Sequence, residues 1–299
     1  MELPITLKVV GGLGNQMHGY VAAFVISRET KRDVVLDGRW LSWTGSNGSR
    51  KCLLPSITIS ETFTPVILKS IWAIKKGPLR RRLASIVAKI QSRNYAGGLN
   101  ADKFGSAAEI LEILQNDSSI QSISGYFSTW DWAEKAKQFE DYSCKISNIS
   151  DDVTKIGEKG SNVIGVHVRL GDYLNHPDIF PIASEEYFLE SIKLLQNNEK
   201  VPYWIYTDDL KNLKIKYPRL LSGSENFFTP KNISELETFY LLSCHSKLVI
   251  SNSTFSSWAA HFSEIKQKTQ IVCPSEYLVN KFIDTRPSHW LRLSMNPQR

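Results

Sequence analysis

A run of β-branched residues at the centre of the chain constrains its fold more than any other feature. Residues 163–168 are Val-Ile-Gly-Val-His-Val, and so apolar a strand is typical of a parallel sheet covered by helices on both faces. The chain continues with Arg-Leu-Gly-Asp-Tyr at residues 169–173. Because open α/β sheets bind ligands at the carboxyl ends of their strands, His167, Arg169 and Asp172 are candidate site residues. The alternative is a hydrogen-bonded core histidine beside a structural Arg169–Asp172 ion pair.

Strand-like and helix-like segments alternate along the chain, which is typical of doubly wound α/β proteins. We predict strands at residues 5–10, 33–36, 120–127, 163–169, 203–206, 247–250 and 271–273. We predict helices at residues 107–114, 184–195 and 234–243, with others that begin near Trp132 and end at Phe262. The polar segment 147–160 is the best candidate for a domain boundary. We therefore expect two Rossmann-like domains, residues 1–150 and 161–299.

The composition is ordinary for a soluble globular protein, with 42% hydrophobic and 22% charged residues. A net charge of +6 suits anionic small molecules or an anionic membrane surface and does not require nucleic acid. Glu2 stands where a signal peptide has basic residues, and no run of about 18 apolar residues occurs, so we expect neither a secretion signal nor a membrane-spanning helix. The four cysteines are widely scattered, which predicts reduced thiols in a cytoplasmic protein.

The first predicted strand ends in a glycine-rich turn, Gly-Gly-Leu-Gly-Asn-Gln-Met at residues 11–17, before a helical pattern. Such a turn lets backbone N–H groups approach an anion at a helix N-terminus. Gly12 and Gly14 also fit the first two glycines of a dinucleotide-binding motif, and Asp37 stands where a ribose-binding acid is expected. Met17, however, occupies the position of the third glycine. A tight turn without a ligand is the remaining alternative.

Two further segments of the first half carry binding hypotheses. Residues 38–60 are predicted to form a long surface loop, where Trp40 can stack on a sugar or hold the loop to its core. Residues 75–93 contain seven basic and no acidic residues, and their apolar residues share one helical face. A helix of this kind can lie on an anionic membrane surface, or it can pack on a domain core.

In the second half, three predicted strand ends bring polar groups to one sheet edge. They carry His167 with Arg169 and Asp172, then Asp208 with Asp209, then five hydroxyl residues within 251–257. An arginine fork and a hydroxyl-rich helix start suit two phosphates, and carboxylates suit the N–H groups of guanine or the hydroxyls of ribose. The set predicts a nucleoside diphosphate site.

Helix capping is the competing explanation at the second and third of these strand ends. It accounts for one carboxylate and one hydroxyl, but not for the whole set. We predict no metal site, because Asp208 and Asp209 lack Asp-x-Asp spacing and the histidines form no paired motif. Arg169 and helix dipoles would then stabilise a leaving diphosphate.

Four motifs in a fixed order are much more specific than any one of them. The segments at residues 11–17, 167–173, 206–209 and 251–258 resemble, in order and separation, those of the bacterial α-1,2-fucosyltransferases, glycosyltransferase family eleven. Gly-Tyr-Phe at residues 125–127 also looks like that family's Gly-Tyr-Phe-Gln-Ser segment. The resemblance spans nearly the whole chain.

The resemblance implies a GT-B fold, with two Rossmann-like domains facing across a cleft. It implies inverting, metal-independent transfer of L-fucose from GDP-fucose to the 2-hydroxyl of a terminal β-galactose, with no cofactor. The N-terminal domain would take the acceptor and the C-terminal domain the GDP-sugar, although another hexose or deoxyhexose donor stays open. The acceptor would be a lipid-linked O-antigen or capsule glycan at the inner face of the cytoplasmic membrane, which residues 75–93 would contact.

By the same resemblance, Arg169 would hold the β-phosphate and stabilise departing GDP. His167 and Asp208 or Asp209 would contact guanine or ribose, and Gly14 and Asn15 the fucose end. The remaining donor-site candidates are Gly12, Gln16, Asn252, Ser253, Thr254, Phe255 and Ser256. The acceptor-site candidates are His18, Trp40 and Asp178. Asp172 ranks first as general base, ahead of His176 and Asp178.

Three positions depart from the family pattern. Leu170 stands where a second arginine is usual, His18 where phenylalanine is common, and Ser128 where the segment has glutamine. Two alternatives to a fucosyltransferase therefore stay open. One is a nucleotide-dependent oxidoreductase that uses Gly12, Gly14 and Asp37. The other is a catalytically inactive GDP-sugar binding homologue.

Overall fold

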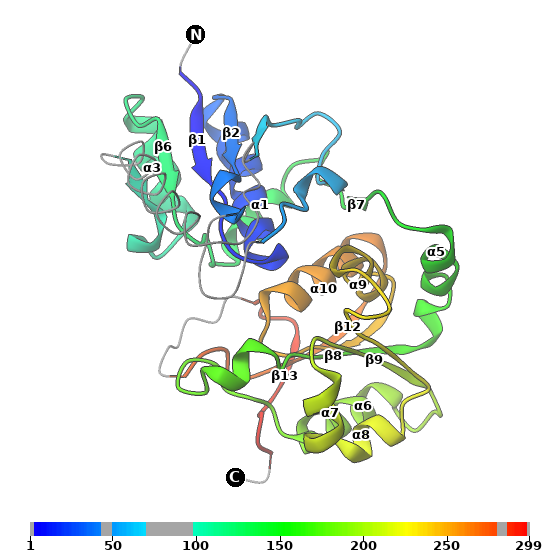
Figure 1. Cartoon of the computed structure of the whole chain (residues 1–299). Coiled ribbons are helices and arrows are strands. Elements are labelled where there is room, and N and C mark those ends of the chain that lie inside the picture. The colour runs from blue at the N-terminus through cyan, green and yellow to red at the C-terminus, as the bar shows by residue number, and fades with distance from the viewer. Residues whose placement is uncertain (1–2, 43–49, 70–97, 280–285, 298–299) are drawn as a thin grey trace, which may run out of the picture. The chain divides into compact units, whose positions relative to one another are not determined.

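The computed structural model describes residues 3–42, 50–69, 98–279 and 286–297, and the chain divides into two compact units, residues 1–145 and 146–299. We call these unit 1 and unit 2 (Figure 1). The predicted basic helix over residues 75–93 lies outside the described residues. The division falls just before the polar segment 147–160 that we predicted as the boundary.

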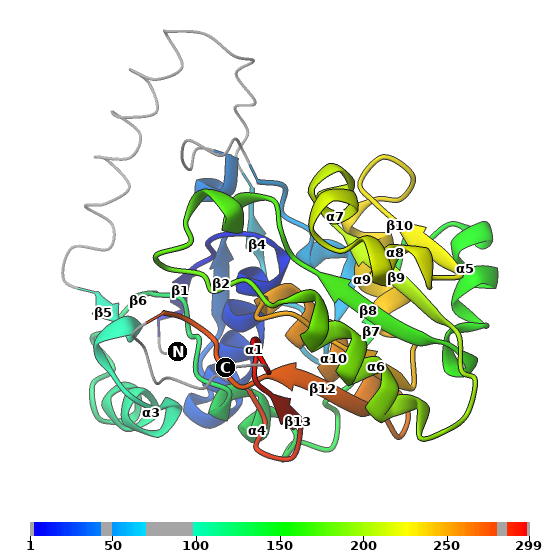
Figure 2. The same cartoon turned by 90° about the horizontal axis from the view of Figure 1, so that it is seen from below.

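Unit 1 contains a parallel sheet with the strand order β4-β2-β1-β6-β5 in the described residues (Figure 2). Its strands are β1 (Ile5–Lys8), β2 (Val34–Asp37), β4 (Ile67–Leu68), β5 (Leu99–Asn100) and β6 (Ser122–Ser124). Its helices are α1 (Leu13–Thr30), α3 (Ala107–Asn116) and α4 (Asp131–Ala136), with short turns η1 (Arg39–Ser42), η2 (Leu54–Ser56) and η3 (Ala101–Lys103). Strand β3 (Ile57–Thr58) pairs with β7 (Lys145–Ile146) in a separate two-stranded sheet. Helix α1 packs against α3 and α4 and is buried over most of residues 13–26, which explains its apolar sequence.

Unit 2 contains a second parallel sheet, with the order β10-β9-β8-β11-β12-β13. Its strands are β8 (Ile164–Val168), β9 (Tyr203–Thr207), β10 (Asn226–Phe228), β11 (Lys247–Val249), β12 (Gln270–Pro274) and β13 (Leu291–Leu293). Its helices are α5 (Asp151–Gly157), α6 (Glu185–Gln196), α7 (Leu210–Lys216), α8 (Pro218–Ser222), α9 (Glu235–Leu242) and α10 (Thr254–Lys266), with turns η4 (Gly160–Asn162) and η5 (Asp172–Asn175). Helices α6, α7 and α8 lie on one face of the sheet and α9 and α10 on the other (Figure 1).

Local sequence explains the central strand and the helix starts. All five residues of β8 are buried, so the predicted central strand is confirmed. Ser184 caps α6 by accepting a hydrogen bond from the Tyr187 N–H, as its position predicted. Ser234 and Glu237 form a reciprocal capping box at the start of α9.

Each sheet has a topological switch point at its first strand. In unit 1, β1 lies between β2 and β6, and in unit 2, β8 lies between β9 and β11. The chain therefore builds each sheet outward on both sides of its first strand. In open α/β sheets, ligands bind at such a switch point, beyond the carboxyl ends of the strands. The two candidate positions are the ends of β1 and β6 and the ends of β8 and β11.

Several elements differ from prediction. Strand β6 ends at Ser124 rather than Phe127, because Gly125 and Phe127 have φ angles of +146° and +51°, outside the β region. The predicted boundary segment contains α5, which packs on α9 in unit 2. Helices α7 and α8 and strands β10 and β13 were not predicted from the sequence. No described helix is both long and apolar enough to cross a membrane.

Candidate functional site

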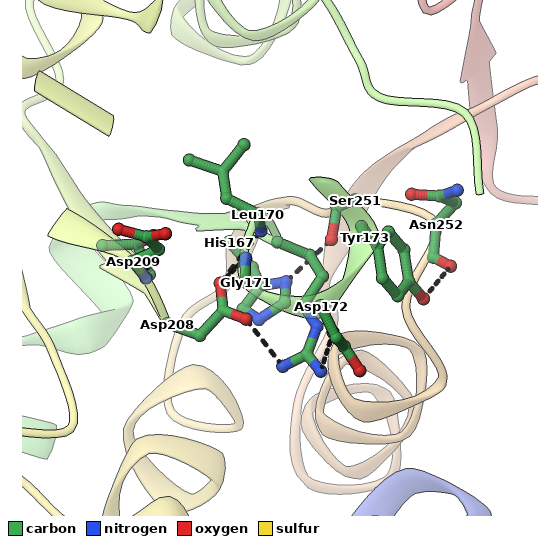
Figure 3. Close-up of polar contacts among 11 residues, drawn as sticks. His167, Leu170, Gly171, Asp172, Tyr173, Asp208, Asp209, Ser251 and Asn252 are labelled. Atoms are coloured by element: carbon green, nitrogen blue, oxygen red, sulfur yellow. Dashed lines mark hydrogen bonds and ion pairs between the residues drawn. The ribbon is translucent and has the colours of Figure 1, made fainter. Parts of the chain in front are cut away.

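The switch point of unit 2 gathers the polar residues that follow β8, β9 and β11 (Figure 3). The register pairs His167 with Tyr206 and Val168 with Thr207, so the residues after β8 and β9 emerge side by side. Strand β11 flanks β8 on the other side and leads to Ser251. The structure therefore brings the three predicted strand ends together.

Arg169 is the central charged group of this edge. Its Nη2 donates to Asp172 Oδ1 at 2.6 Å, and its Nη1 lies 3.0 Å from Asp208 Oδ2 (Figure 3). Burial lowers the pKa of Arg169, but the two carboxylates outweigh burial and raise that pKa above its ordinary value. The Nε–H is buried and has no hydrogen-bond partner among the described residues. The guanidinium is thus charged at neutral pH, and its buried Nε–H donor is left without a partner in the described part of the structure.

Asp208 is anchored to the backbone of the turn that carries Arg169. Its Oδ1 accepts hydrogen bonds from the N–H groups of Leu170 at 2.9 Å and Gly171 at 3.3 Å. A Cβ at Gly171 would overlap Asp208 Oδ2, so only glycine leaves room for this carboxylate. Asp208, predicted as a donor contact, therefore orders the turn and holds Arg169.

Asp209 has a different role from its neighbour. It is the N-cap of α7, where Oδ1 accepts from the Asn212 N–H at 3.0 Å and Oδ2 from Asn212 Nδ2 at 2.6 Å. These hydrogen bonds lower the pKa of Asp209. Of the two adjacent carboxylates, Asp209 is therefore the one that helix capping explains, and its predicted donor contact has no support in this geometry.

His167 is a buried, neutral histidine. Burial, with a smaller contribution from the Arg169 charge, lowers its pKa to about 3. Its Nδ1 lies 2.9 Å from Ser251 Oγ, which joins the ends of β8 and β11 across the switch point (Figure 3). The Phe255 ring lies 5.6 Å away, centroid to centroid. His167 can position these elements, but at neutral pH it supplies no charge to a ligand.

Two of the five predicted hydroxyl residues bond to the start of their own helix. The hydroxyls of Ser256 and Ser257 both donate to the Ser253 carbonyl at 3.1 Å. Ser253 is the N-cap of α10, and its side chain makes no capping hydrogen bond. The features that remain suited to an anion are the first-turn N–H groups of α10, beginning at Thr254, and the helix dipole.

Asn252 organises the loops around the edge. Its Nδ2 donates to the carbonyls of Pro181 and Tyr277, both at 3.0 Å, and its own carbonyl accepts from the Tyr173 hydroxyl at 3.2 Å. Asn252 thus has a structural role, and its predicted donor contact stays a prediction. Asp178, a predicted acceptor residue, lies exposed in the loop that these contacts hold.

Leu170, which replaces the family's second arginine, is fully buried in the core of unit 2 with Val168 and Tyr187. Its side chain points away from the carboxylates of Asp172 and Asp208 (Figure 3). The side chain at position 170 therefore faces the apolar interior, and only the backbone N–H of Leu170 contributes to the polar edge.

In unit 1, the glycine turn follows β1 at the other switch point. Gly12 is the N-cap of α1, and a Cβ there would meet no atom within 4 Å, so the space beside it is open. Gly14 is buried in the first turn of α1, and the Asn15 side chain packs against Gly11. The open backbone at Gly12 is compatible with the anion contact that the sequence predicts.

Gln16 supports this turn from within. Its Nε2 donates to the carbonyls of Gly11 at 3.2 Å and Lys51 at 2.9 Å, and its Oε1 accepts from the Leu53 N–H at 3.1 Å. The amide is 1% exposed. Gln16 therefore ties the turn to residues 51–53, and its predicted donor contact stays a prediction.

The predicted acceptor residues of unit 1 are not supported. His18 is 1% exposed and packs edge-on against Trp130 at 6.2 Å, and burial lowers its pKa to about 3. The burial of His18 could not be predicted from the sequence, because the pattern of α1 alone does not show that the helix is covered on nearly all sides. The Trp40 side chain lies outside the described part of the structure.

Asp37 argues against dinucleotide binding. It is fully buried, and its two carboxylate oxygens bind Nε and Nη2 of Arg39 at 2.8 and 2.9 Å. This bidentate pair occupies the carboxylate that would have to accept hydrogen bonds from a ribose.

Tyr126 is a surface residue to which the sequence analysis gave no role. It is 52% exposed at the end of β6, beside the glycine turn of β1 in sheet order. Its sequence indication was the Gly-Tyr-Phe segment at residues 125–127, which looks like a segment of the family. Among the described residues, no group of three His, Cys, Asp or Glu side chains is arranged to hold a metal ion.

Comparison with known proteins identifies the family. The model of glycosyl transferase family 11 matches residues 118–287, more than half of the chain. The chain belongs to glycosyltransferase family 11. This family 11 glycosyltransferase is 26% identical over 310 residues to an α-1,2-colitosyltransferase of Escherichia coli, covering 97% of this chain and 98% of that protein. It is 25% identical over 309 residues to the O-antigen biosynthesis glycosyltransferase WbnK of E. coli, covering 95% and 98%.

Solved structures agree on the fold. The fucosyltransferase NodZ from Bradyrhizobium aligns over 87% of this chain and 93% of its own, with a TM-score of 0.51 and 15% identity. POFUT1 in complex with GDP aligns over 91% and 98%, with a TM-score of 0.50 and 11% identity. The family 11 glycosyltransferase therefore has the GT-B α/β fold that the resemblance implied.

Proposed function

We propose that this family 11 glycosyltransferase transfers L-fucose from GDP-fucose to the 2-hydroxyl of a terminal β-galactose, with inversion at the anomeric carbon. The observation that carries the proposal is Arg169 at the switch point of unit 2, next to the end of the strand that leads into α10. A fixed guanidinium and the N-terminus of a helix together suit a diphosphate. A structure of the α-1,6-fucosyltransferase NodZ soaked with GDP-fucose has the same fold, which supports this donor.

The residues take distinct roles in the proposed reaction. Arg169 holds the β-phosphate, and the first-turn N–H groups of α10 hold the other phosphate. The acceptor oxygen forms a bond to the anomeric carbon while the bond from that carbon to the phosphate oxygen breaks, and its electron pair leaves with GDP. Asp172 accepts the proton of the acceptor hydroxyl as general base. In unit 1, Gly14 and Asn15 contact the fucose end, as the family resemblance implies.

Colitose, a dideoxyhexose, is a second candidate for the transferred sugar. The relevant observation is the near full-length similarity to an α-1,2-colitosyltransferase. Both candidates are deoxyhexoses transferred to a 2-hydroxyl, so the proposed chemistry at Arg169 and Asp172 is the same. Turnover of GDP-fucose compared with GDP-colitose distinguishes them.

The acceptor is proposed to be a lipid-linked O-antigen or capsule glycan, and similarity to an O-antigen biosynthesis glycosyltransferase supports that role. We further propose contact with the inner face of the cytoplasmic membrane through residues 75–93, whose sequence is basic and amphipathic. Sedimentation with vesicles that contain anionic lipid tests the contact. Loss of sedimentation on replacing three of these basic residues by Gln is the expected result.

The first experiment measures GDP release from GDP-fucose with and without β-galactosyl disaccharides, in the presence of EDTA. We expect release that depends on the acceptor, persists in EDTA and falls at least 100-fold in Arg169→Ala. Arg219→Ala is the matched control, because Arg219 is exposed and pairs with Glu185 and Glu186. Release abolished by EDTA would contradict metal-independent transfer, and equal loss in both variants would contradict the role of Arg169.

Two alternatives remain testable with the same protein. An oxidoreductase would be stabilised against thermal unfolding by NAD, whereas a GDP-sugar enzyme would be stabilised by GDP. The bidentate Asp37–Arg39 pair favours stabilisation by GDP over stabilisation by NAD. A catalytically inactive homologue would bind GDP without turnover of any donor.

A further inference from the structure

The two carboxylates on Arg169 are anchored very differently. Asp208 is held by two backbone N–H groups as well as by Arg169. Among the described residues, the Asp172 carboxylate forms hydrogen bonds and ion pairs only with Arg169. Asp172 is also 32% exposed, in the short turn η5. Asp172 can therefore leave Arg169 at little cost, whereas Asp208 cannot.

The charges at this edge favour such a departure. One guanidinium shared by two carboxylates leaves a net negative cluster, which opposes the approach of a diphosphate. Both Nη atoms of Arg169 are already paired, while its Nε–H has no partner among the described residues. An anion that took the place of Asp172 would remove the excess negative charge beside the guanidinium and could satisfy this orphaned donor.

We propose that the donor diphosphate displaces Asp172 from Arg169, while Asp208 remains and fixes the orientation of the guanidinium. This exchange rests on the proposed function, because it takes the β-phosphate as the incoming anion. Asp208 is then a positioning residue, and Asp172 is an internal competitor of the donor. Displacement frees the Asp172 carboxylate to accept the acceptor's proton, so the general base becomes available only after the donor has bound.

The exchange predicts effects of opposite sign for two carboxylates on the same arginine. In Asp172→Asn, GDP should bind about 5-fold more tightly by calorimetry, since a competitor is lost, while kcat falls at least 100-fold. In Asp208→Asn, GDP should bind at least 10-fold more weakly, because Arg169 loses its anchor. Glu186→Gln is the matched control, since Glu186 pairs with Arg219 instead, and it should change GDP affinity less than 2-fold.

A double-mutant cycle separates competition from a general charge effect. If Asp172 acts by occupying Arg169, the tighter GDP binding of Asp172→Asn should disappear in the Arg169→Ala background. The exchange is wrong if Asp172→Asn tightens GDP binding by the full amount in the Arg169→Ala background. It is also wrong if Asp172→Asn alone weakens GDP binding. If the parent protein fails to bind GDP at all, the proposed function itself is wrong. If Asp208→Asn does not fold, the double-mutant cycle of Asp172→Asn with Arg169→Ala is sufficient to test the exchange.

A second inference concerns unit 1 and rests on backbone strain around Tyr126. Gly125 has a φ of +146°, and a Cβ there would lie 2.9 Å from the Ala101 Cβ. Phe127 has a φ of +51°, which is rare for a bulky residue, and its side chain is 3% exposed against Trp132. The Tyr126 N–H donates to Asp102 Oδ1 at 2.7 Å. The strained turn therefore buries Phe127 and holds Tyr126 outward.

We infer that Tyr126 is a stacking surface for a pyranose ring of the acceptor, which again rests on the proposed function. Backbone strain of this kind concentrates at functional sites. The residue follows β6, which neighbours β1 at the switch point of the unit 1 sheet. An exposed aromatic face offers an apolar surface to the C–H groups of a sugar, while the Tyr hydroxyl stays in water.

Saturation-transfer NMR with a β-galactosyl disaccharide tests this subsite without requiring turnover. Tyr126→Ala should remove most of the transferred signal and raise the acceptor KM at least 5-fold, with GDP affinity unchanged. Tyr126→Phe should retain both, because the ring face is kept. Phe227→Ala, which removes another exposed aromatic, is the control. Unchanged saturation transfer in Tyr126→Ala overturns the inference, whatever the donor proves to be.

Discussion

Asp208 Oδ2 lies 2.3 Å from the place where a Cβ at position 171 would stand, at the end of β8. The carboxylate fits there because residue 171 is glycine and has no side chain. The carboxylate that fills this space binds the N–H groups of Leu170 and Gly171 and also Nη1 of Arg169. The backbone of the turn and the proposed phosphate-binding arginine are therefore held by one side chain. Loss of the glycine should act on the arginine through Asp208.

Gly171→Ala is expected to weaken GDP binding about 10-fold and to lower turnover, because the new methyl group displaces Asp208 Oδ2 from Arg169. Isothermal titration with GDP measures the first effect. Gly105→Ala is the control, since a Cβ at Gly105 would meet only the Glu109 carboxylate at 3.8 Å. GDP affinity within 2-fold of the parent would show that Asp208 is not needed to hold Arg169.

Leu170→Arg, which restores the residue usual in the family, is expected to destabilise this chain rather than to improve donor binding. Position 170 is fully buried among apolar side chains, and an unpaired charge there should cost more than about 3 kcal/mol. Urea unfolding of Leu170→Arg and of the volume-conserving Leu170→Met measures the difference. Tighter GDP binding by a fully stable Leu170→Arg protein would contradict the orientation of this side chain.

Asp209→Ala should lower stability without a specific loss of donor binding. Removal of the α7 cap is expected to cost about 1 kcal/mol, or roughly 2–4 °C in Tm for a unit of this size. Differential scanning calorimetry with and without GDP tests both parts, because GDP should raise the Tm of variant and parent by the same amount. A 10-fold weaker GDP affinity would restore the donor contact first predicted for this residue.

His245 should make stability depend on pH in the acidic range. Its Nδ1 faces the carbonyls of Gly160 and Val163, so Nδ1 carries the proton, and Nε2 accepts from the Tyr206 hydroxyl at 2.7 Å. Burial lowers its pKa from 6.5 to about 4, and the two carbonyls only partly oppose burial. A pKa lowered in the folded state means that the unfolded chain binds the proton first.

The contribution of His245 is therefore fully present above pH 6.5 and is lost as the pH falls toward 4, by about 3 kcal/mol in total. His18 and His167, whose pKa values are also lowered, change stability in the same direction. Urea unfolding from pH 4 to 8 measures the slope, and His245→Gln should reduce it. An NMR titration of the parent in which the His245 ring protonates near pH 6.5 would contradict this assignment without needing the variant.

Much of the fold was predictable because its determinants are local. The β-branched residues of 163–168 identify a strand buried on both faces, and Ser184 and Ser234 mark helix starts through hydrogen bonds to residues three positions away. The parallel α/β class follows from the alternation of such elements. The strand predicted over 120–127 was too long, because the φ angles of Gly125 and Phe127 come from packing against Ala101 and Trp132.

The site was predictable as a set of strand ends, but not residue by residue. Asp208 and Asp209 are adjacent acids that the sequence pattern does not distinguish. In the structure, Asp208 binds the turn after β8 and Asp209 caps α7. His18 and Gln16 have the polarity of ligand-binding residues, and the structure buries both. Nothing in the linear pattern distinguishes a polar side chain that faces a ligand from one that supports the backbone.

The sequence by itself determined the α/β class, the order of the main strands and the sheet edges that carry the polar residues, because periodicity and capping act over a few positions. Only the tertiary structure decided what each polar side chain contacts. Asp208 meets Leu170 across 38 positions and His167 meets Ser251 across 84. Such partners come together only when strands pair, and strand pairing depends on burial of the whole sheet rather than on any one segment.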